Sequence, residues 1–179
     1  MNIENRLILV KKYSKAFVNT FKDKLSIDDI DLIENLIHYL KQNRNIFIYI
    51  NLSIVEFKIK KDFFSKLIKL FKLKEFFTDL TNLLLESNRI FLLIYILKDI
   101  IKIYMQEIGF IKFNIVSSHN INNKNLEIIK NFLKNKTGKN ILTRLSIDKS
   151  LIAGIKIYSD ELAWQYSIKN YINAIKQIN

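Results

Sequence analysis

The first hundred residues repeat apolar side chains at helical spacing. A first helix is predicted because one face carries side chains at i, i+3, i+4, i+7, i+8 and i+11, namely Val10, Tyr13, Ser14, Phe17, Val18 and Phe21. Ser26 then begins a capping-box-like sequence with Asp29 at the fourth position, which predicts the start of a second amphipathic helix that ends near Asn43. The second helix carries Ile30, Ile33, Leu36, Ile37 and Leu40.

Four more helices are expected in this part of the chain. The side-chain pattern of residues 46–51 fits a strand as well as a helix. Because the neighbouring segments are helical, we expect a short third helix there. Asp62 is the expected N-cap of a fourth helix, and residues 74–87 predict a fifth. Asn88 marks the break before a sixth helix, which runs from Arg89 to about Gln106. Leucine and isoleucine on both faces of the last two helices favour central positions in a bundle.

The pattern changes after Gly109. Residues 110–117 predict a strand with Phe113 and Ile115 on one side and Asn114 on the other. A polar loop over residues 118–125 precedes a helix over 126–133, for which Gly138 is the expected left-handed C-cap. Strands are predicted over residues 141–147 and 151–158, around a turn at 148–150. A final amphipathic helix is expected to bear Ile168, Tyr171, Ile172 and Ile175.

These elements predict an α+β fold with two domains. An N-terminal six-helix bundle is expected over residues 1–107, and a small C-terminal α/β domain over residues 108–179. Gly154 lies inside the last predicted strand, which indicates a bulge or a close approach of another backbone. Trp164 is expected in the last connection, either as a core anchor or as an interface hot spot.

Composition adds a strong positive charge of +12. Such a balance suits a polyanionic partner, but we favour A/T-rich codon usage as its cause, since lysine, isoleucine and asparagine dominate while proline is absent. Only four arginines are present, which favours the codon explanation because phosphate and guanine recognition use arginine. Between Lys58 and Lys74, seven lysines accompany a single acid, Asp62. This span is interpreted either as a basic amphipathic helix for a membrane surface or acidic partner, or as the solvated face of a bundle helix, which we favour.

No catalytic, cofactor or metal site is predicted. The absence of cysteine excludes disulfides, thiolate zinc sites and cysteine nucleophiles. His38 and His119 have no second ligand at metal spacing, and the sequence around Gly138 lacks the other residues of a phosphate-binding loop. The chain has no apolar run of about 20 residues and no signal or transit pattern at its start, so we expect it to act where it is made.

Arg89, between two helices, is expected to reach a carboxylate or open carbonyls across the bundle.

Three stretches resemble the delta subunit of F-type ATP synthases, the family of the mitochondrial oligomycin sensitivity conferral protein. Residues 13–17, Tyr-Ser-Lys-Ala-Phe, are similar to the Tyr-Ala-x-Ala-Leu stretch that opens the family. Residues 83–90, with Asn88 and Arg89, resemble the junction between its last two bundle helices. Residues 147–155 resemble its strand signature and contain Asp148, Ser150 and Gly154.

Further positions agree with the family or depart from it. Ser167 stands where the family has a serine that opens its final helix. Ala153 replaces a family glycine. Around the final hairpin, the family's glycine and aspartate are replaced by Asp160, Gln165 and Tyr166.

The resemblance implies a non-catalytic stator without cofactor. The bundle would hold an N-terminal helix of the alpha subunit in a groove, and the C-terminal domain would bind the b subunits of the peripheral stalk. The chain would resist rotation during ATP synthesis at the cytoplasmic face of a bacterial inner membrane, with no nucleic acid and no homo-oligomer. The alternative is a protein that binds nucleic acid or an anionic membrane through Lys58–Lys74. Alpha contacts would involve residues that a bundle core also needs, namely Tyr13, Phe17, Phe21, Phe77, Leu80 and Leu84.

Overall fold

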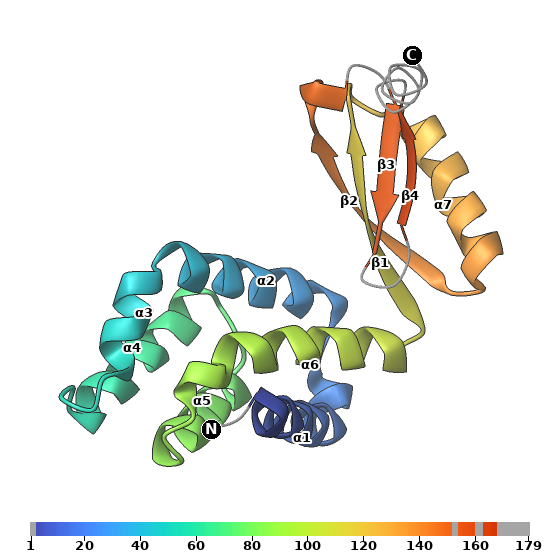
Figure 1. Ribbon diagram of the computed structural model, residues 1–179. Coiled ribbons are helices and arrows are strands. Elements are labelled where there is room, and N and C mark those ends of the chain that lie inside the picture. Colours follow the sequence, from blue (N-terminus) through green and yellow to red (C-terminus); the bar gives the residue numbers. More distant parts are fainter. Residues whose placement is uncertain (1–2, 152–153, 160–162, 168–179) are drawn as a thin grey trace. The chain divides into compact units, whose positions relative to one another are not determined.

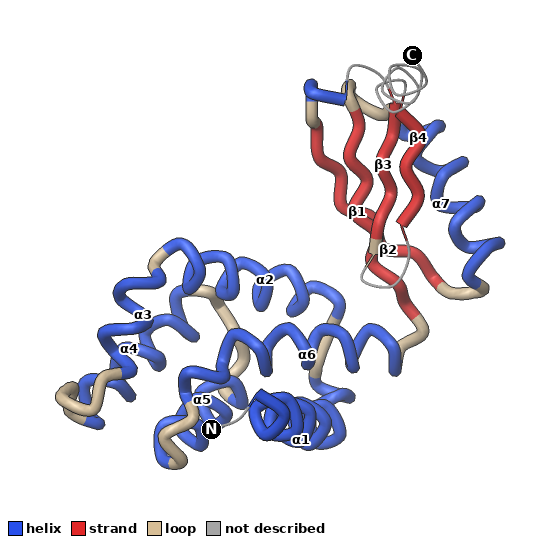
Figure 2. The backbone as a smooth tube through the Cα atoms, in the orientation of Figure 1, coloured by secondary structure: helices blue, strands red, loops and turns tan. Residues whose placement is uncertain are grey.

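The computed structural model describes residues 3–151, 154–159 and 163–167. The chain divides into two compact units, Met1–Tyr104 and Met105–Asn179. Over the described residues, the first unit is helical, and the second is a small sheet with one helix beside it (Figure 1 and Figure 2). The predicted α+β fold, with an N-terminal helical bundle and a small C-terminal α/β part, is therefore confirmed.

The helical unit contains the six predicted helices. Their bounds are α1 (Ile3–Phe21), α2 (Ile27–Gln42), α3 (Arg44–Asn51), α4 (Phe57–Leu70), α5 (Phe76–Glu86) and α6 (Leu93–Glu107). Two short 3₁₀ turns, η1 (Lys22–Lys24) and η2 (Ile90–Leu92), precede α2 and α6. The core is apolar and almost closed to solvent, because each helix buries the face that its periodicity predicts.

Two helix starts test the capping predictions. Asp29 accepts hydrogen bonds from the Ser26 backbone N–H at 2.8 Å and from the Ser26 hydroxyl at 2.9 Å, which confirms the predicted start of α2. The prediction that Asp62 caps the fourth helix is wrong. The Lys60 N–H already donates to the Glu56 carbonyl at 3.2 Å, so α4 begins at Phe57, before an N-cap at Asp62 is needed.

The ends of α4 and α5 share one backbone motif. The Leu73 N–H donates to the Ile68 carbonyl at 3.0 Å, and the Arg89 N–H donates to the Leu84 carbonyl at 2.7 Å. In both cases the preceding residue, Lys72 or Asn88, has a φ of 54°. These are Schellman ends, which close the last carbonyls of a helix through one left-handed residue. The predicted break at Asn88 is therefore the left-handed cap of α5, a conformation that asparagine tolerates.

The α/β unit is built on a mixed sheet. Its elements are β1 (Phe110–Ser117), α7 (Asn123–Thr137), β2 (Asn140–Ile147), η3 (Lys149–Leu151), β3 (Gly154–Tyr158) and β4 (Ala163–Ser167). The strand order is β2-β1-β3-β4. β1 runs parallel to β2 through the α7 crossover, and β3 runs antiparallel to both β1 and β4. Because β1 lies between them, β2 and β3 are consecutive in the chain but do not pair.

Packing in this unit follows the predicted alternation. Phe113 and Ile115 of β1 are fully buried, as is Leu133 of α7, whereas Asn114 faces the other side. α7 extends the predicted helix at both ends, and the Asn122 side chain caps it by accepting from the Asn125 N–H at 2.8 Å. Gly138 ends α7 with φ of 67°, as predicted.

The last part of the sheet differs from the prediction. The strand expected over residues 151–158 begins at Gly154, because residues 149–151 form the turn η3. Trp164 lies in β4, opposite Ile157, and not in a connection. Ala153, Asp160 and the final helix predicted to bear Ile168, Tyr171, Ile172 and Ile175 lie outside the described residues.

Candidate partner-binding site

Aromatic side chains join α1 to α5. The ring of Phe17 lies 5.1 Å from that of Phe77, and the ring of Phe21 stacks on that of Phe76 with centroids 4.6 Å apart. Such pairs add to the free energy of burial, so they fix these two helices side by side. The line along which α1 and α5 meet is called the α1–α5 seam below.

The six residues expected to contact an alpha subunit divide into two groups. Phe77, Leu80 and Leu84 of α5 are buried, and so is Phe17 of α1. Tyr13 and Phe21 are only partly buried. A partner can touch only side chains that reach the surface, so the buried four act as the packed floor beneath the seam.

Leu83 was not predicted as a surface residue of this seam. It is 50% exposed and lies one turn before Ser87 and two turns after Phe76 on α5. Both of those residues contact α1, because Phe76 stacks on Phe21 and Ser87 accepts from Tyr13. Leu83 therefore lies on the side of α5 that faces the seam. Its spacing of seven residues from Phe76 is the sequence signal that identifies it.

A polar cluster lies on the same seam. The Arg89 Nη1 donates to the Tyr13 hydroxyl at 2.8 Å, and that hydroxyl donates to the Ser87 Oγ at 3.5 Å. The guanidinium also lies 5.9 Å from the centre of the Tyr13 ring. Arg89 was expected to bind a carboxylate or open carbonyls, whereas its partner here is a phenol. The contact unites two stretches of the family resemblance that are far apart in the sequence.

The surroundings of the Tyr13 phenol lower its pKa. Burial raises the pKa of Tyr13, but the hydrogen bonds with Ser87 and Arg89 and the positive charge of Arg89 outweigh burial and lower that pKa below its usual value. The seam thus presents an exposed apolar side chain, Leu83, and a positive charge, Arg89, which Tyr13 holds in place. These groups suit an amphipathic helix that carries a carboxylate.

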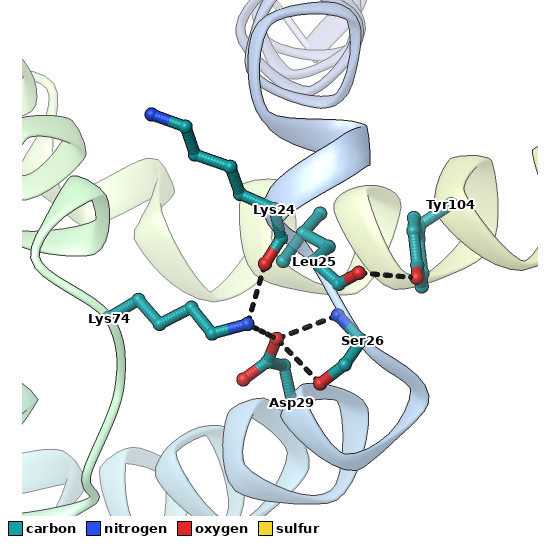
Figure 3. A network of polar contacts seen from close by, with 6 residues as sticks. All are labelled: Lys24, Leu25, Ser26, Asp29, Lys74 and Tyr104. Atoms are coloured by element: carbon teal, nitrogen blue, oxygen red, sulfur yellow. Dashed lines mark hydrogen bonds and ion pairs between the residues drawn. The ribbon is translucent and has the colours of Figure 1, made fainter.

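A second polar network ties together the connections between helices (Figure 3). Asp29 is 4% exposed, and its Oδ2 pairs with the Lys74 Nζ at 2.5 Å. Lys74 also donates to the Lys24 carbonyl at 2.5 Å, and the Tyr104 hydroxyl donates to the Leu25 carbonyl at 2.9 Å. Burial and the charge of Asp29 raise the pKa of Tyr104. One lysine of the basic span, Lys74, is therefore used inside the helical unit.

The remaining family-motif positions shape the sheet. The Asp148 Oδ1 accepts from the Ser150 N–H at 2.9 Å and so holds the turn after β2. Gly154 has a φ of 129°, a conformation that favours glycine, and it pairs with Ser167 of β4. The Gly154 carbonyl also accepts from the Ser118 N–H at 3.4 Å. These contacts give Asp148, Ser150, Gly154 and Ser167 structural positions.

The two histidines belong to different units. His38 lies on α2, and the His119 Nδ1 lies 2.9 Å from the Ser118 Oγ. Within residues 3–151, 154–159 and 163–167, no group of three or more histidine, cysteine or acidic side chains is placed to hold a metal ion. Over the same residues, no helix has the length and apolar character needed to cross a bilayer.

Comparison with known proteins gives consistent similarities. Residues 9–178 match the family model described as ATP synthase delta (OSCP) subunit. The ATP synthase subunit delta of Wigglesworthia glossinidia brevipalpis is 29% identical over 168 residues, which cover 93% of each chain. That of Trichlorobacter lovleyi is 27% identical over 119 residues, or 66% of each chain. A chain of the Toxoplasma gondii mitochondrial ATP synthase hexamer shares the fold, with a TM-score of 0.62 and 15% identity over 94% of this chain and 96% of that chain.

Proposed function

The chain belongs to the ATP synthase delta (OSCP) subunit family, and we propose that it joins the catalytic head of the enzyme to the b subunits of the peripheral stalk. It is a non-catalytic subunit of that stalk and a peripheral part of the membrane-bound complex. A stator of this kind resists the torque of the rotating central stalk, so that rotation drives nucleotide release in the head. The task requires extended, stiff contacts with two partners and no reacting groups.

The helical unit binds the head by receiving an amphipathic N-terminal helix of the alpha subunit along the α1–α5 seam. The observation that carries this assignment is the half-exposed Leu83 on the side of α5 that faces α1, where buried aromatic rings join the two helices. Tyr13 and Phe21 extend the accessible part of the seam on α1. Arg89, held in place by Tyr13, supplies a positive charge for a carboxylate on the bound helix.

The α/β unit binds the carboxyl-terminal ends of the b subunits. Two large apolar side chains one turn apart on α7, Ile128 and Phe132, are exposed. On β2, Leu145 and Ile147 are also exposed and point to one face of the sheet. Exposed apolar side chains at these spacings support contact with helical partners.

The complex would place this chain at the cytoplasmic face of a bacterial inner membrane. Binding of nucleic acid or an anionic membrane through Lys58–Lys74 is not favoured. The apolar face of α4 is turned into the bundle at Phe64, Leu67 and Ile68, and Lys74 is paired with Asp29. Lys66 and Lys69 of α4 are exposed, as expected for the solvated outer face of a bundle helix.

The test is calorimetric titration of the full chain with a peptide of the cognate alpha-subunit N-terminus at 50 and 300 mM salt. We expect binding that changes little with salt and that weakens about tenfold or more in Leu83→Ser, as for loss of an interface anchor. Leu145→Ser, which removes a similarly exposed leucine from the other unit, should bind the peptide like the wild type. No peptide binding at either salt, together with tight salt-sensitive RNA binding, would overturn the proposed function.

A further inference from the structure

The connection between α3 and α4 carries apolar side chains where exposed loops usually carry glycine, proline, asparagine or serine. Ile54 at its tip is 84% exposed. Seven large apolar side chains in this region are at least 45% exposed: Ile46, Ile48, Tyr49, Leu52, Ile54, Phe57 and Ile59. Residues 46–61, which hold them, are called the α3–α4 corner.

The backbone of the corner is held in place. The Leu52 N–H donates to the Tyr49 carbonyl at 3.0 Å, and the Val55 N–H donates to the Leu52 carbonyl at 3.2 Å. Val55 itself is buried, and Phe47 and Ile50 bury the inner face of α3. The exposed side chains therefore stand on an anchored turn, so they form a built surface. Apolar surface of this extent, next to charged side chains, marks an interaction site.

The positive charge of the corner favours an acidic partner. Three lysines, Lys58, Lys60 and Lys61, stand against one carboxylate, Glu56, in residues 46–61. Lys58 and Lys61 are exposed beside Phe57 and Ile59. The complementary surface has apolar side chains in its centre and carboxylates at its rim.

Other occupants fit the corner less well. A second copy of this chain would set lysines against lysines. A nucleic acid offers phosphates to the lysines but little for aliphatic side chains such as Leu52 and Ile54. A bilayer binds a long apolar helical face, whereas the apolar face of α4 is buried beyond its first turns. We propose that the α3–α4 corner binds an acidic amphipathic segment of another protein chain.

The corner is distinct from the α1–α5 seam. Figure 1 shows α3, α4 and their connection at the end of the helical unit away from α1. The two surfaces can therefore be occupied at once. That the acidic chain is another subunit of the ATP synthase rests on the proposed function.

The experiment measures binding of the full chain to two probes, the purified cognate catalytic head without this subunit and the soluble part of the cognate b subunits. Ile54→Ser with Phe57→Ser should weaken binding to one probe about tenfold or more. Lys58→Gln with Lys61→Gln should weaken the same interaction more at 50 mM than at 300 mM salt, because salt screens exposed charges. Leu70→Ser is the matched control, since Leu70 is an exposed apolar residue of α4 outside the corner.

The outcomes separate the two proposals. If the wild type binds a probe and the Ile54→Ser, Phe57→Ser variant binds both probes equally well, the corner proposal is overturned and the proposed function stands. If the wild type binds neither probe, the proposed function fails and the corner loses its assigned partner with it. Binding to phosphatidylglycerol vesicles that this double variant loses, without any change toward the two probes, would assign the corner to lipid. Far-ultraviolet circular dichroism of each variant confirms that its helices are intact.

Discussion

Two tyrosines of the helical unit, Tyr13 and Tyr104, make polar contacts of similar kind in different surroundings. Tyr104 is buried at the end of α6, and its hydroxyl donates to a backbone carbonyl in the same network as Asp29 and Lys74. Tyr13 is partly exposed on the α1–α5 seam, and its hydroxyl accepts from Arg89. Their pKa values move in opposite directions, upward for Tyr104 and downward for Tyr13.

The difference shows that buried polar contacts stabilise the fold, whereas exposed ones remain accessible to a partner. In the Tyr104 network, the Tyr104 side chain and the Asp29 carboxylate are buried, so water cannot readily replace a partner that either of them loses, and their contacts hold the connections between helices. At the Tyr13 cluster, water can replace a lost partner, so the contact adds little stability and remains available to a bound helix. Variants of each group should therefore separate stability from partner binding.

The largest effect is expected for Asp29→Ala. This substitution removes the acidic half of the capping box of α2 and the partner of Lys74, so the free energy of unfolding should fall by about 2 to 3 kcal/mol. The fall is below that of a fully buried pair because Lys74 can reach water. Urea unfolding followed by circular dichroism at 222 nm measures it. Asp28→Ala, an exposed acid in the same turn, is the control, and equal losses for both variants would contradict the structural role of the network.

A smaller effect should distinguish the two hydroxyls. Tyr104→Phe leaves the Leu25 carbonyl without its partner in a buried place, which should cost about 1 to 2 kcal/mol. Tyr13→Phe should cost less than about 1 kcal/mol, since Arg89 can bind water instead. The same unfolding experiment compares them. A larger loss for Tyr13→Phe would reverse the assignment of a structural and a surface role.

The smallest effect concerns alkaline pH. The raised pKa of Tyr104 means that its contribution to stability is complete below its usual pKa of 10.0 and is lost as the pH rises through its folded value. The lowered pKa of Tyr13 means that its contribution is complete above 10.0 and is lost as the pH falls through its folded value. Between pH 9 and 11, Tyr104→Phe should therefore flatten the alkaline loss of stability, and Tyr13→Phe should steepen it. Parallel curves for the two variants would show that the environments do not differ.

Local patterns were sufficient for much of this protein. The Ser26–Asp29 start of α2, the left-handed Gly138 and the buried pair Phe113 and Ile115 were all predicted, because each depends on residues a few positions apart. The predicted start of α4 at Asp62 was too late. The helix already begins at Phe57, so Asp62 lies inside it and is not its N-cap. The strand β4 was missed because its five residues acquire strand geometry by pairing with β3.

The sequence predicted the helices that form the candidate site, but not which of their side chains are exposed. Leucines occupy positions 83, 84 and 85 in a row, and hydropathy alone does not tell which of them reaches solvent. Packing of α5 buries Leu84 and Leu85 and leaves Leu83 half exposed. Likewise, the exposed side chains of the α3–α4 corner look like core residues in the sequence.

By itself, the sequence determined the helical and α/β parts, several helix ends and the family, because these depend on short-range periodicity, capping and motifs. Only the tertiary structure decided that Arg89 meets Tyr13, that Lys74 meets Asp29, and that β1 lies between β2 and β3. These partners are tens of residues apart, and many apolar faces could pair equally well on local grounds. Close packing of whole elements selects one arrangement, and the polar partners follow from it.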